Sequence, residues 1–300
     1  MKDVYLLSGF LGSGKTSLLS HLIEQFKAAG LKPAVIMNEL GKLNFDSRSV
    51  DGDVPLKEML EGCICCTGSE KMEAQLQMLL EGENFDVLLI ETTGAAHPVE
   101  ALDAVFSPLF ADRLNMKGII TVADCKRWLD RDKLTPQTKM LFLEQIRHAH
   151  LIVANKIDLL TEVEASDVTM QIQALNSTAP IIQTTNSKIP LNLITKLEAT
   201  FHEKEINQTA IGKQLTLSSR LHTFKEAVKQ EEFEEWVRNL PDTIYRMKGY
   251  VPLVGHKNPY LFQYAYGMVQ WLPEYMKMSP QIVIIGDQVN QIDIIGSSHD

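Results

Sequence analysis

The chain has 300 residues, of which 45% are hydrophobic and 22% charged, a balance typical of a soluble globular protein with one large and one smaller domain. Its formal net charge of −9 argues against nucleic acid or an anionic membrane as a partner, because both would be repelled. Four cysteines are too few for a disulfide framework, and the amino terminus lacks the features of a signal peptide, so we expect a cytoplasmic protein.

The predicted elements alternate between strands and helices over roughly the first two thirds of the chain. Short, continuously apolar strands separated by helices are typical of a parallel sheet covered by helices on both faces. The sequence therefore predicts an α/β fold. The expected strands are residues 4–7, 33–37, 86–90, 118–123, 151–154 and 180–184, and the expected helices include 15–28, 70–80 and 164–176.

The pattern changes after about Phe201, where the polar stretch HEKEINQTAIGK resembles a linker. Beyond it we expect a small α+β unit whose aromatic side chains mostly pack its own core. After the stretch LTLSSRLHTF at 215–224, its expected elements are a helix at 225–240 and strands at 243–253, 260–272 and 281–286. We therefore predict a main domain over 1–203, a linker over 204–212 and a C-terminal domain over 213–300.

The stretch GFLGSGKT, Gly9 to Thr16, matches G-x-x-x-x-G-K-[ST] between a predicted strand and a predicted helix. Glycines there let successive backbone N–H groups point at phosphate, and the helix dipole adds attraction. Lys15 is expected to reach the β- and γ-phosphates and act in catalysis, and the Thr16 hydroxyl to ligate Mg²⁺. The expected nucleotide contacts are Gly9, Gly12, Ser13, Gly14, Lys15, Thr16 and Ser17.

The stretch NKID, Asn155 to Asp158, directly follows the fifth predicted strand. An aspartate there can accept two hydrogen bonds from guanine, and adenine would leave its carboxylate unsatisfied, so GTP is favoured over ATP. Asn155 is expected to hold the loop and contact the base, and Lys156 to lay its stem over the base plane. Residues 184–188, TTNSK, could add base contacts or be an ordinary loop.

The stretch ETTG, Glu91 to Gly94, ends the third predicted strand. An acidic residue at this position can hold Mg²⁺ through water, so Glu91 is a candidate catalytic residue. The N–H of Gly94 can bind the γ-phosphate and so respond to hydrolysis.

Three cysteines, Cys63, Cys65 and Cys66, precede the helix that begins near Glu70. Three thiolates within four residues suit Zn²⁺ or a related thiophilic ion and leave a position for a further ligand, for which Glu39 is the candidate. A redox cysteine cluster and ordinary buried cysteines are the alternatives. Cys125 ends an apolar strand and is expected to be buried and structural.

Together, GFLGSGKTS, VIMNELG, GCICC, ETTG and NKID, in this order, resemble the CobW family of P-loop GTPases, over nearly the whole chain. The resemblance implies slow GTP hydrolysis and metal binding at the three cysteines with Glu39 nearby, coupled to the nucleotide state. It also implies delivery of zinc or cobalt to a client metalloprotein, and related GTPases dimerise on GTP. Asp46 lies where related GTPases keep a switch carboxylate that could position the attacking water.

Two positions depart from that family pattern. His97 stands where an aspartate often precedes the proline; it could be an extra metal ligand, although a loop histidine is more often solvated. Lys42 replaces an acidic residue in the family's NEFGE stretch, a change that could weaken metal binding or alter metal preference.

Two other functions stay open. One is a P-loop kinase that phosphorylates a small molecule. The other is a non-enzymatic redox or zinc-buffering protein that uses only the cysteines.

Overall fold

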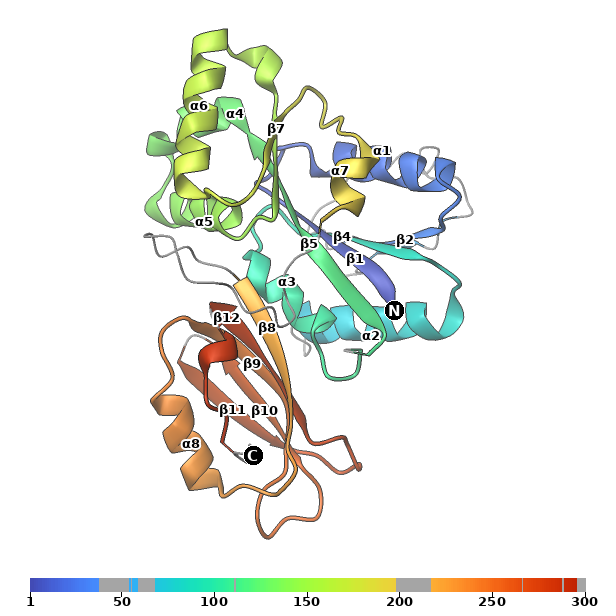
Figure 1. Cartoon of the computed structure of the whole chain (residues 1–300), viewed down its shortest axis with the longest axis vertical. Helices are drawn as coiled ribbons and strands as arrows, with labels where there is room; N and C mark the ends of the chain where they lie inside the picture. Colours follow the sequence, from blue (N-terminus) through green and yellow to red (C-terminus); the bar gives the residue numbers. More distant parts are fainter. Residues whose placement is uncertain are drawn as a thin grey trace. The chain divides into compact units, whose positions relative to one another are not determined.

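The computed structural model describes residues 1–37, 54, 56–58, 68–110, 112–197, 217–265, 267–287 and 289–295 (Figure 1). The chain forms two compact units, Met1–Ala104 with Arg113–Ala199, and Val105–Asp112 with Thr200–Asp300. The predicted boundaries at 203 and 213 fall outside the described residues and remain predictions.

A parallel sheet is the centre of the first unit, and its strands follow the order β3-β2-β4-β1-β5-β6-β7. All six predicted strands are present. The sequence missed β3, whose three residues, LKE, are too few to carry a periodic signal. The strands are β1 (Lys2–Ser8), β2 (Pro33–Met37), β3 (Leu56–Glu58), β4 (Val87–Glu91), β5 (Leu114–Asp124), β6 (Leu151–Asn155) and β7 (Ile181–Gln183).

Helices cover both faces of this sheet, as the α/β prediction requires. Figure 1 shows α1 on one side and α2 on the other. Helix α6 begins two residues earlier than predicted, because the Thr161 hydroxyl and the Glu164 carboxylate form a capping box. The helices are α1 (Lys15–Ala28), α2 (Gly68–Gly82), α3 (Pro98–Val105), α4 (Cys125–Leu129), α5 (Pro136–Arg147), α6 (Glu162–Leu175) and α7 (Leu191–Thr195), with 3₁₀ turns at Arg131–Lys133 and Ile157–Leu159.

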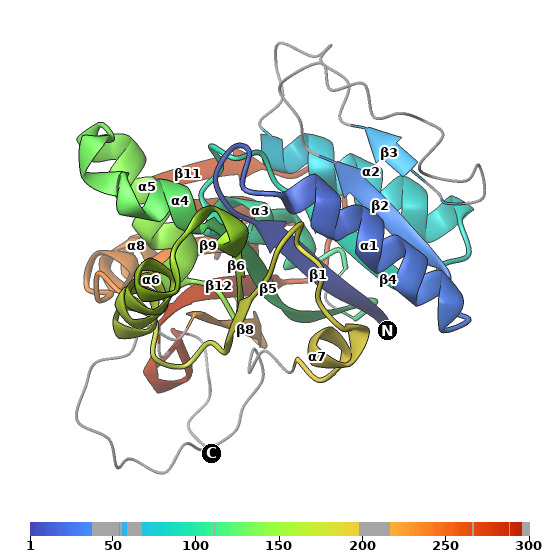
Figure 2. The same cartoon turned by 90° about the horizontal axis from the view of Figure 1, so that it is seen from above.

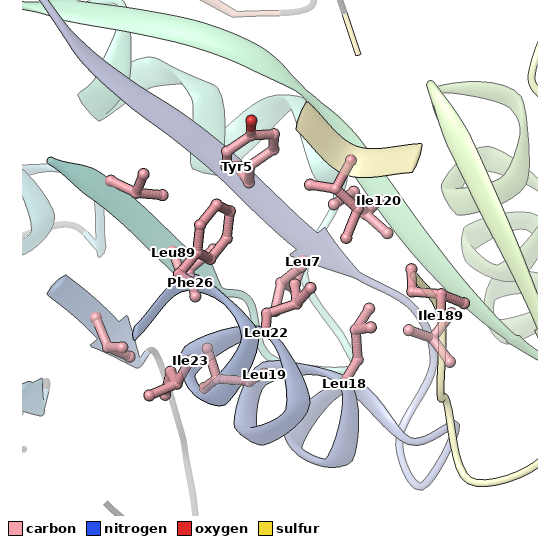
Figure 3. Close-up of a cluster of buried hydrophobic side chains, with 14 of the residues drawn as sticks. Tyr5, Leu7, Leu18, Leu19, Leu22, Ile23, Phe26, Leu89, Ile120 and Ile189 are labelled. Atoms are coloured by element: carbon pink, nitrogen blue, oxygen red, sulfur yellow. The ribbon is translucent and has the colours of Figure 1, made fainter. Parts of the chain in front are cut away.

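Helix α1 packs through one apolar stripe. Its buried side chains recur at helical spacing, Leu18, Leu19, Leu22, Ile23 and Phe26. Figure 3 shows them in one cluster with alternate side chains of β1, Tyr5 and Leu7. Burial of this stripe holds the first turn of α1 beside the end of β1.

A second cluster joins helices α4, α5 and α6 to β6, through Trp128, Phe142, Ile146 and Val168 among others. Cys125 is fully buried in this cluster, so the prediction of a structural cysteine is confirmed. Burial, with the nearby Asp124 charge, raises the pKa of its thiol to about 12, so the thiolate is scarce at neutral pH.

The second unit contains an antiparallel sheet in the order β11-β10-β9-β12-β8, accompanied by α8, so the α+β prediction is confirmed. Its aromatic core includes Phe233, Phe262 and the partly buried Trp271. The elements are β8 (Leu217–Thr223), α8 (Gln230–Arg238), β9 (Ile244–Val251), β10 (Tyr260–Ala265), β11 (Met268–Pro273), β12 (Gln281–Asp287) and a 3₁₀ turn at Val289–Gln291.

Two predictions in this unit were wrong in detail. The helix begins at Gln230 rather than at residue 225, because the backbone of Val228 is bonded to Pro252 and Val254. The expected single strand over 260–272 is a hairpin, in which Ala265 pairs with Met268. Gly267 has φ +87°, a backbone conformation that glycine adopts without strain.

None of the helices within the described ranges combines the length and apolar character that crossing a membrane would need.

Candidate nucleotide-binding site

The candidate site lies at the carboxyl edge of the parallel sheet. Leu7 pairs with Glu91, and Asp124 pairs with Asn155, so the loops that follow these strands emerge at the same edge. Figure 2 shows the first of them, the loop that connects the tip of β1 to α1. The sheet topology thus brings together GFLGSGKT, ETTG and NKID, which are far apart in the sequence.

The phosphate loop adopts a backbone conformation that requires glycine. Gly9, Gly12 and Gly14 have φ values of +133°, +74° and +112°. A Cβ on Gly9 would lie 2.3 Å from the Val122 oxygen, and one on Gly14 would lie 2.4 Å from Asn155 Nδ2. Gly9 and Gly14 therefore leave no room for a side chain, and a residue with a Cβ at Gly12 would be strained.

Lys15 is buried, with 6% of its surface exposed, and its ammonium lies inside the loop. Its Nζ donates to the carbonyl oxygens of Gly9 at 2.9 Å and Phe10 at 3.3 Å. Ser13 of the loop is buried, whereas Ser17, on the first turn of α1, is exposed. The positive charge is thus held where anionic phosphates would enter.

The Thr16 hydroxyl donates to Oε1 of Glu91, with 2.8 Å between the oxygens. Glu91 is buried, with 2% of its surface exposed. A hydroxyl and a carboxylate oxygen at this separation are the hard oxygen donors that Mg²⁺ prefers, so these residues fit a magnesium ion.

A cavity of about 280 Å³ lies between the phosphate loop and residues 91–94. Gly94 touches the loop closely: a Cβ there would lie 2.4 Å from the backbone nitrogen of Leu11. The segment after β4 therefore cannot move toward the phosphate loop without displacing Leu11.

Asn155 ties two loops together. Its Nδ2 donates to the Ser13 carbonyl at 2.7 Å, and its Oδ1 accepts from the Ser187 N–H at 2.9 Å. The Ser187 hydroxyl in turn donates to the Gly14 carbonyl at 3.0 Å. The TTNSK segment thus contacts the phosphate loop, a contact the sequence did not predict.

Two further residues at this edge were missed by sequence reasoning. Asp124 accepts a hydrogen bond from the Lys156 ammonium at 2.6 Å and also caps α4. Arg127 donates to the Leu11 carbonyl at 3.0 Å, with its guanidinium over the Phe10 ring. The position of Asp124 at the end of an apolar strand was a usable signal. Asp158 is exposed just beyond this pair.

A larger cavity, about 430 Å³, lies between α6 and β7, away from the phosphate loop. Its walls are apolar and hydroxyl side chains together with the Gln183 amide, and Glu162 is the charged residue among them. It offers no cation for a phosphate, so the smaller cavity is the better candidate.

Five predicted site residues, Glu39, Asp46, Cys63, Cys65 and Cys66, lie outside the described residues, and so does Lys42.

His97 is not on the solvated loop that was expected. It is partly buried, and its ring meets that of His148 on the segment after α5, with centroids 5.5 Å apart. Burial, and then the neighbouring His148, lower the pKa of His97 to about 4. The hydrogen bond from His148 lowers the pKa of Glu144 to about 2. At neutral pH this cluster therefore holds a neutral His97 and an ionised Glu144.

Comparison with protein families gives two matches. Residues 3–183 match the family described as CobW/HypB/UreG, nucleotide-binding domain. Residues 217–296 match the family described as cobalamin synthesis protein cobW C-terminal domain.

Individual relatives are similar over most of this chain. The zinc chaperone YjiA of Escherichia coli is 30% identical, over 87% of this chain and 85% of its own. Zinc-regulated GTPase metalloprotein activator 1 of Dictyostelium discoideum is 29% identical over 83% of this chain. The match covers 55% of that protein, so this chain spans about half of its length. The crystal structure of Zn(II)-bound YjiA GTPase from E. coli has a TM-score of 0.55 and 26% identity, and covers 96% of this chain and 94% of its own.

Proposed function

The chain belongs to the CobW/HypB/UreG family of P-loop GTPases, and we propose that it is a GTP-hydrolysing metallochaperone. It binds a thiophilic divalent ion, zinc or alternatively cobalt, and delivers it to a client metalloprotein. The observation that carries the proposal is the convergence of the phosphate loop, Glu91 and NKID at one sheet edge. The names of the relatives, zinc chaperone and zinc-regulated GTPase metalloprotein activator, support zinc as the cargo.

In this proposal the phosphate loop binds the triphosphate of GTP. Lys15 exchanges its bonds to the Gly9 and Phe10 carbonyls for the β- and γ-phosphate oxygens. Backbone N–H groups of the loop and the first turn of α1 supply further donors. Because the ammonium is already desolvated inside the loop, little further desolvation opposes this exchange.

The Thr16 hydroxyl and, through water, the Glu91 carboxylate would hold Mg²⁺. When bound, magnesium offsets the negative charge of the phosphates. The hydrogen bond between Thr16 and Glu91 keeps both oxygens beside the space that the ion would occupy.

Guanine selection rests on Asp158, which would accept the guanine N1–H and the exocyclic amine. The Lys156 stem would cover the base, and its bond to Asp124 fixes the direction of that side chain. Asn155 holds the base loop to the phosphate loop, so base and phosphate recognition share one rigid frame.

Hydrolysis would proceed by attack of water on the γ-phosphorus, with release of GDP and phosphate and a low intrinsic rate. Asp46 is the residue proposed to position this water. The Gly94 N–H would bind the γ-phosphate, and loss of that phosphate would release the segment that contacts Leu11.

The metal ion to be transferred is proposed to bind to Cys63, Cys65 and Cys66, with Glu39 as a fourth ligand. The affinity of this site for the metal ion is proposed to depend on the bound nucleotide. Three thiolates with a fourth oxygen ligand suit zinc or cobalt and leave exchange with a client feasible. We also propose a cytoplasmic location and a nucleotide-dependent homodimer.

The decisive experiment is a pair of zinc titrations, one on the protein loaded with a non-hydrolysable GTP analogue and one on the GDP form. The proposal expects a difference of about tenfold or more in zinc affinity. Equal affinities would contradict it. The replacement of all three cysteines, Cys63, Cys65 and Cys66, by serine is the control that removes the cargo site.

Two measurements separate the alternatives. A small-molecule kinase would release no phosphate from GTP until an acceptor is added. A redox or zinc-buffering protein would keep all its cellular activity in a Lys15→Ala variant, which the GTPase proposal expects to be inactive.

A further inference from the structure

A cluster of three potential metal ligands lies apart from the three cysteines in the sequence. It consists of His97, after β4, and Glu144 and His148, four residues apart on α5 and its end. One ligand atom from each side chain lies within 4.8 Å of the other two. Residues four apart on a helix share one face, so Glu144 and His148 converge on His97.

The spacing of these atoms is close to that of a metal site. His148 Nε2 and Glu144 Oε2 are 3.2 Å apart. Two ligands of a tetrahedral zinc ion, each bonded at about 2.0–2.1 Å, lie about 3.3 Å from each other. The ligand nitrogen of His97 lies within 4.8 Å of these two atoms, so it must move closer to them to complete three corners of such a site.

The three side chains are largely shielded from solvent, and one of the carboxylate oxygens is directed at a histidine. His148 is buried, and His97 and Glu144 are partly buried. Arg147 binds the other carboxylate oxygen, Oε1, and leaves Oε2 directed at His148. Two imidazole nitrogens and one carboxylate oxygen form a ligand set that zinc and related ions accept, with a fourth position left for water.

The cluster is linked to the nucleotide site. The Gln145 amide, on α5, donates to the carbonyl oxygens of Gly94 and Ala96, each at 3.3 Å. Gly94 contacts the phosphate loop at Leu11. A metal ion in the cluster would therefore fasten residues 94–97 to α5.

We propose that His97, Glu144 and His148 form a second site for a zinc-class divalent ion, which clamps the segment between Gly94 and α3 onto α5. This site goes beyond the proposed function, which uses the cysteine loop alone. The competing interpretation is a hydrogen-bonded cluster that never holds a metal.

The test uses the full chain with Cys63, Cys65 and Cys66 all replaced by serine, titrated with Co²⁺ and read by visible absorption. We expect one remaining equivalent with d–d bands and no thiolate charge-transfer band, and Zn²⁺ should displace it. Each of the further substitutions His97→Ala, Glu144→Gln and His148→Ala, made in this triple-serine chain, should weaken Co²⁺ binding at least about tenfold. Loss of even an outer partner of a metal ligand has an effect of that size.

The matched control is His256→Ala, which removes an exposed histidine of the second unit and should leave Co²⁺ affinity unchanged. If His148→Ala fails to fold by circular dichroism, Glu144→Gln decides, since it keeps the side-chain volume. Absence of Co²⁺ binding in the triple-serine chain, or unchanged affinity in these ligand variants, would overturn the second site. Either result leaves the cysteine-based proposal standing, because its zinc titration is a separate measurement.

Discussion

At the scale of single residues, the candidate site depends on polar side chains that each bind two partners. Asn155 joins Ser13 to Ser187, and Asp124 both caps α4 and binds Lys156. Such side chains lose the freedom to reorient, so the groups around the nucleotide are held in position before it binds. Base selection, by contrast, is assigned to Asp158, which is exposed.

The Asp158→Asn variant should exchange guanine for xanthine specificity. An amide can accept the base N1–H and donate to the xanthine 2-oxo group, but it faces the guanine amine with a second donor. GTP would lose the bond from its exocyclic amine to a charged acceptor, keep only a weaker N1–H bond to a neutral amide oxygen, and face the amide N–H donors with its own amine, so GTP binding should weaken about 100-fold or more. Competition with a fluorescent GDP analogue measures both affinities. Asp167→Asn, an exposed acid on α6, is the control and should change neither.

At the scale of elements, the segment after β4 is confined between the phosphate loop and α5. Gly94 lies against Leu11, and Gln145 holds the Gly94 and Ala96 carbonyls. Near the end of α5, His148 is buried and His150 is partly buried, and His150 accepts a hydrogen bond from the Ile119 N–H at its Nδ1. The confinement of the segment after β4 should affect GTP hydrolysis, and the environment of the histidines should affect the pH dependence of stability.

The Gly94→Ala variant should lower the GTP hydrolysis rate at least about tenfold. Its methyl group would lie 2.4 Å from the Leu11 nitrogen, so the segment must shift away from the phosphate loop. Phosphate release at saturating GTP is the measurement. Gly82→Ala, at the end of α2, meets no atom within 4 Å and should hydrolyse GTP normally. A Gly94→Ala rate equal to that of Gly82→Ala would refute the steric role.

Stability of the first unit should fall as the pH falls from about 6.5 toward 4. Burial lowers the pKa of His97 and of His150 to about 4, below their ordinary value of 6.5. In this window the unfolded chain binds protons that the folded chain does not, so unfolding becomes easier by at most about 1.4 kcal/mol per pH unit for each histidine.

Urea unfolding followed by Trp128 fluorescence measures this slope. Trp236 and Trp271, the tryptophans of the second unit, are replaced by phenylalanine so that only the first unit reports. A His150→Gln substitution should reduce the slope by about half. A stability independent of pH between 6.5 and 5 would show that the histidines are not held neutral.

At the scale of the whole molecule, a nucleotide-binding unit is followed along the chain by an antiparallel α+β unit with its own aromatic core. The proposed metallochaperone activity requires that metal and nucleotide affect one another within this chain. Such coupling is reciprocal by thermodynamic necessity, which makes it testable from either side.

Saturating zinc should therefore raise the affinity of the protein for a GTP analogue relative to its affinity for GDP. The GTP analogue should raise the affinity for zinc, relative to the GDP form, by the same factor. We expect about tenfold in each direction, measured by calorimetry with and without zinc. The variant with serine at positions 63, 65 and 66 should lose the effect and still bind nucleotide. The two factors must be equal if one zinc site is coupled to the nucleotide. Unequal factors would therefore indicate that zinc also acts at another site, such as the His97 cluster.

The local features of this protein were predictable from the amino-acid sequence alone. Apolar runs predicted six strands of the parallel sheet, and the glycines at positions 9, 12 and 14 predicted a loop that only glycine can form. Periodicity and backbone sterics act over a few residues, so they can be read along the chain. The same holds for the family resemblance, which rests on short contiguous motifs.

The contacts between side chains that are distant in the sequence could not be predicted before the three-dimensional fold was known. Thr16 reaches Glu91, Lys156 reaches Asp124, and His97 packs against His148, although each pair lies far apart in the sequence. These contacts depend on strand order, since β1 lies between β4 and β5 rather than beside β2. Strand order is set by the burial of whole sheet faces against helices, a global packing choice that no local stretch of sequence carries.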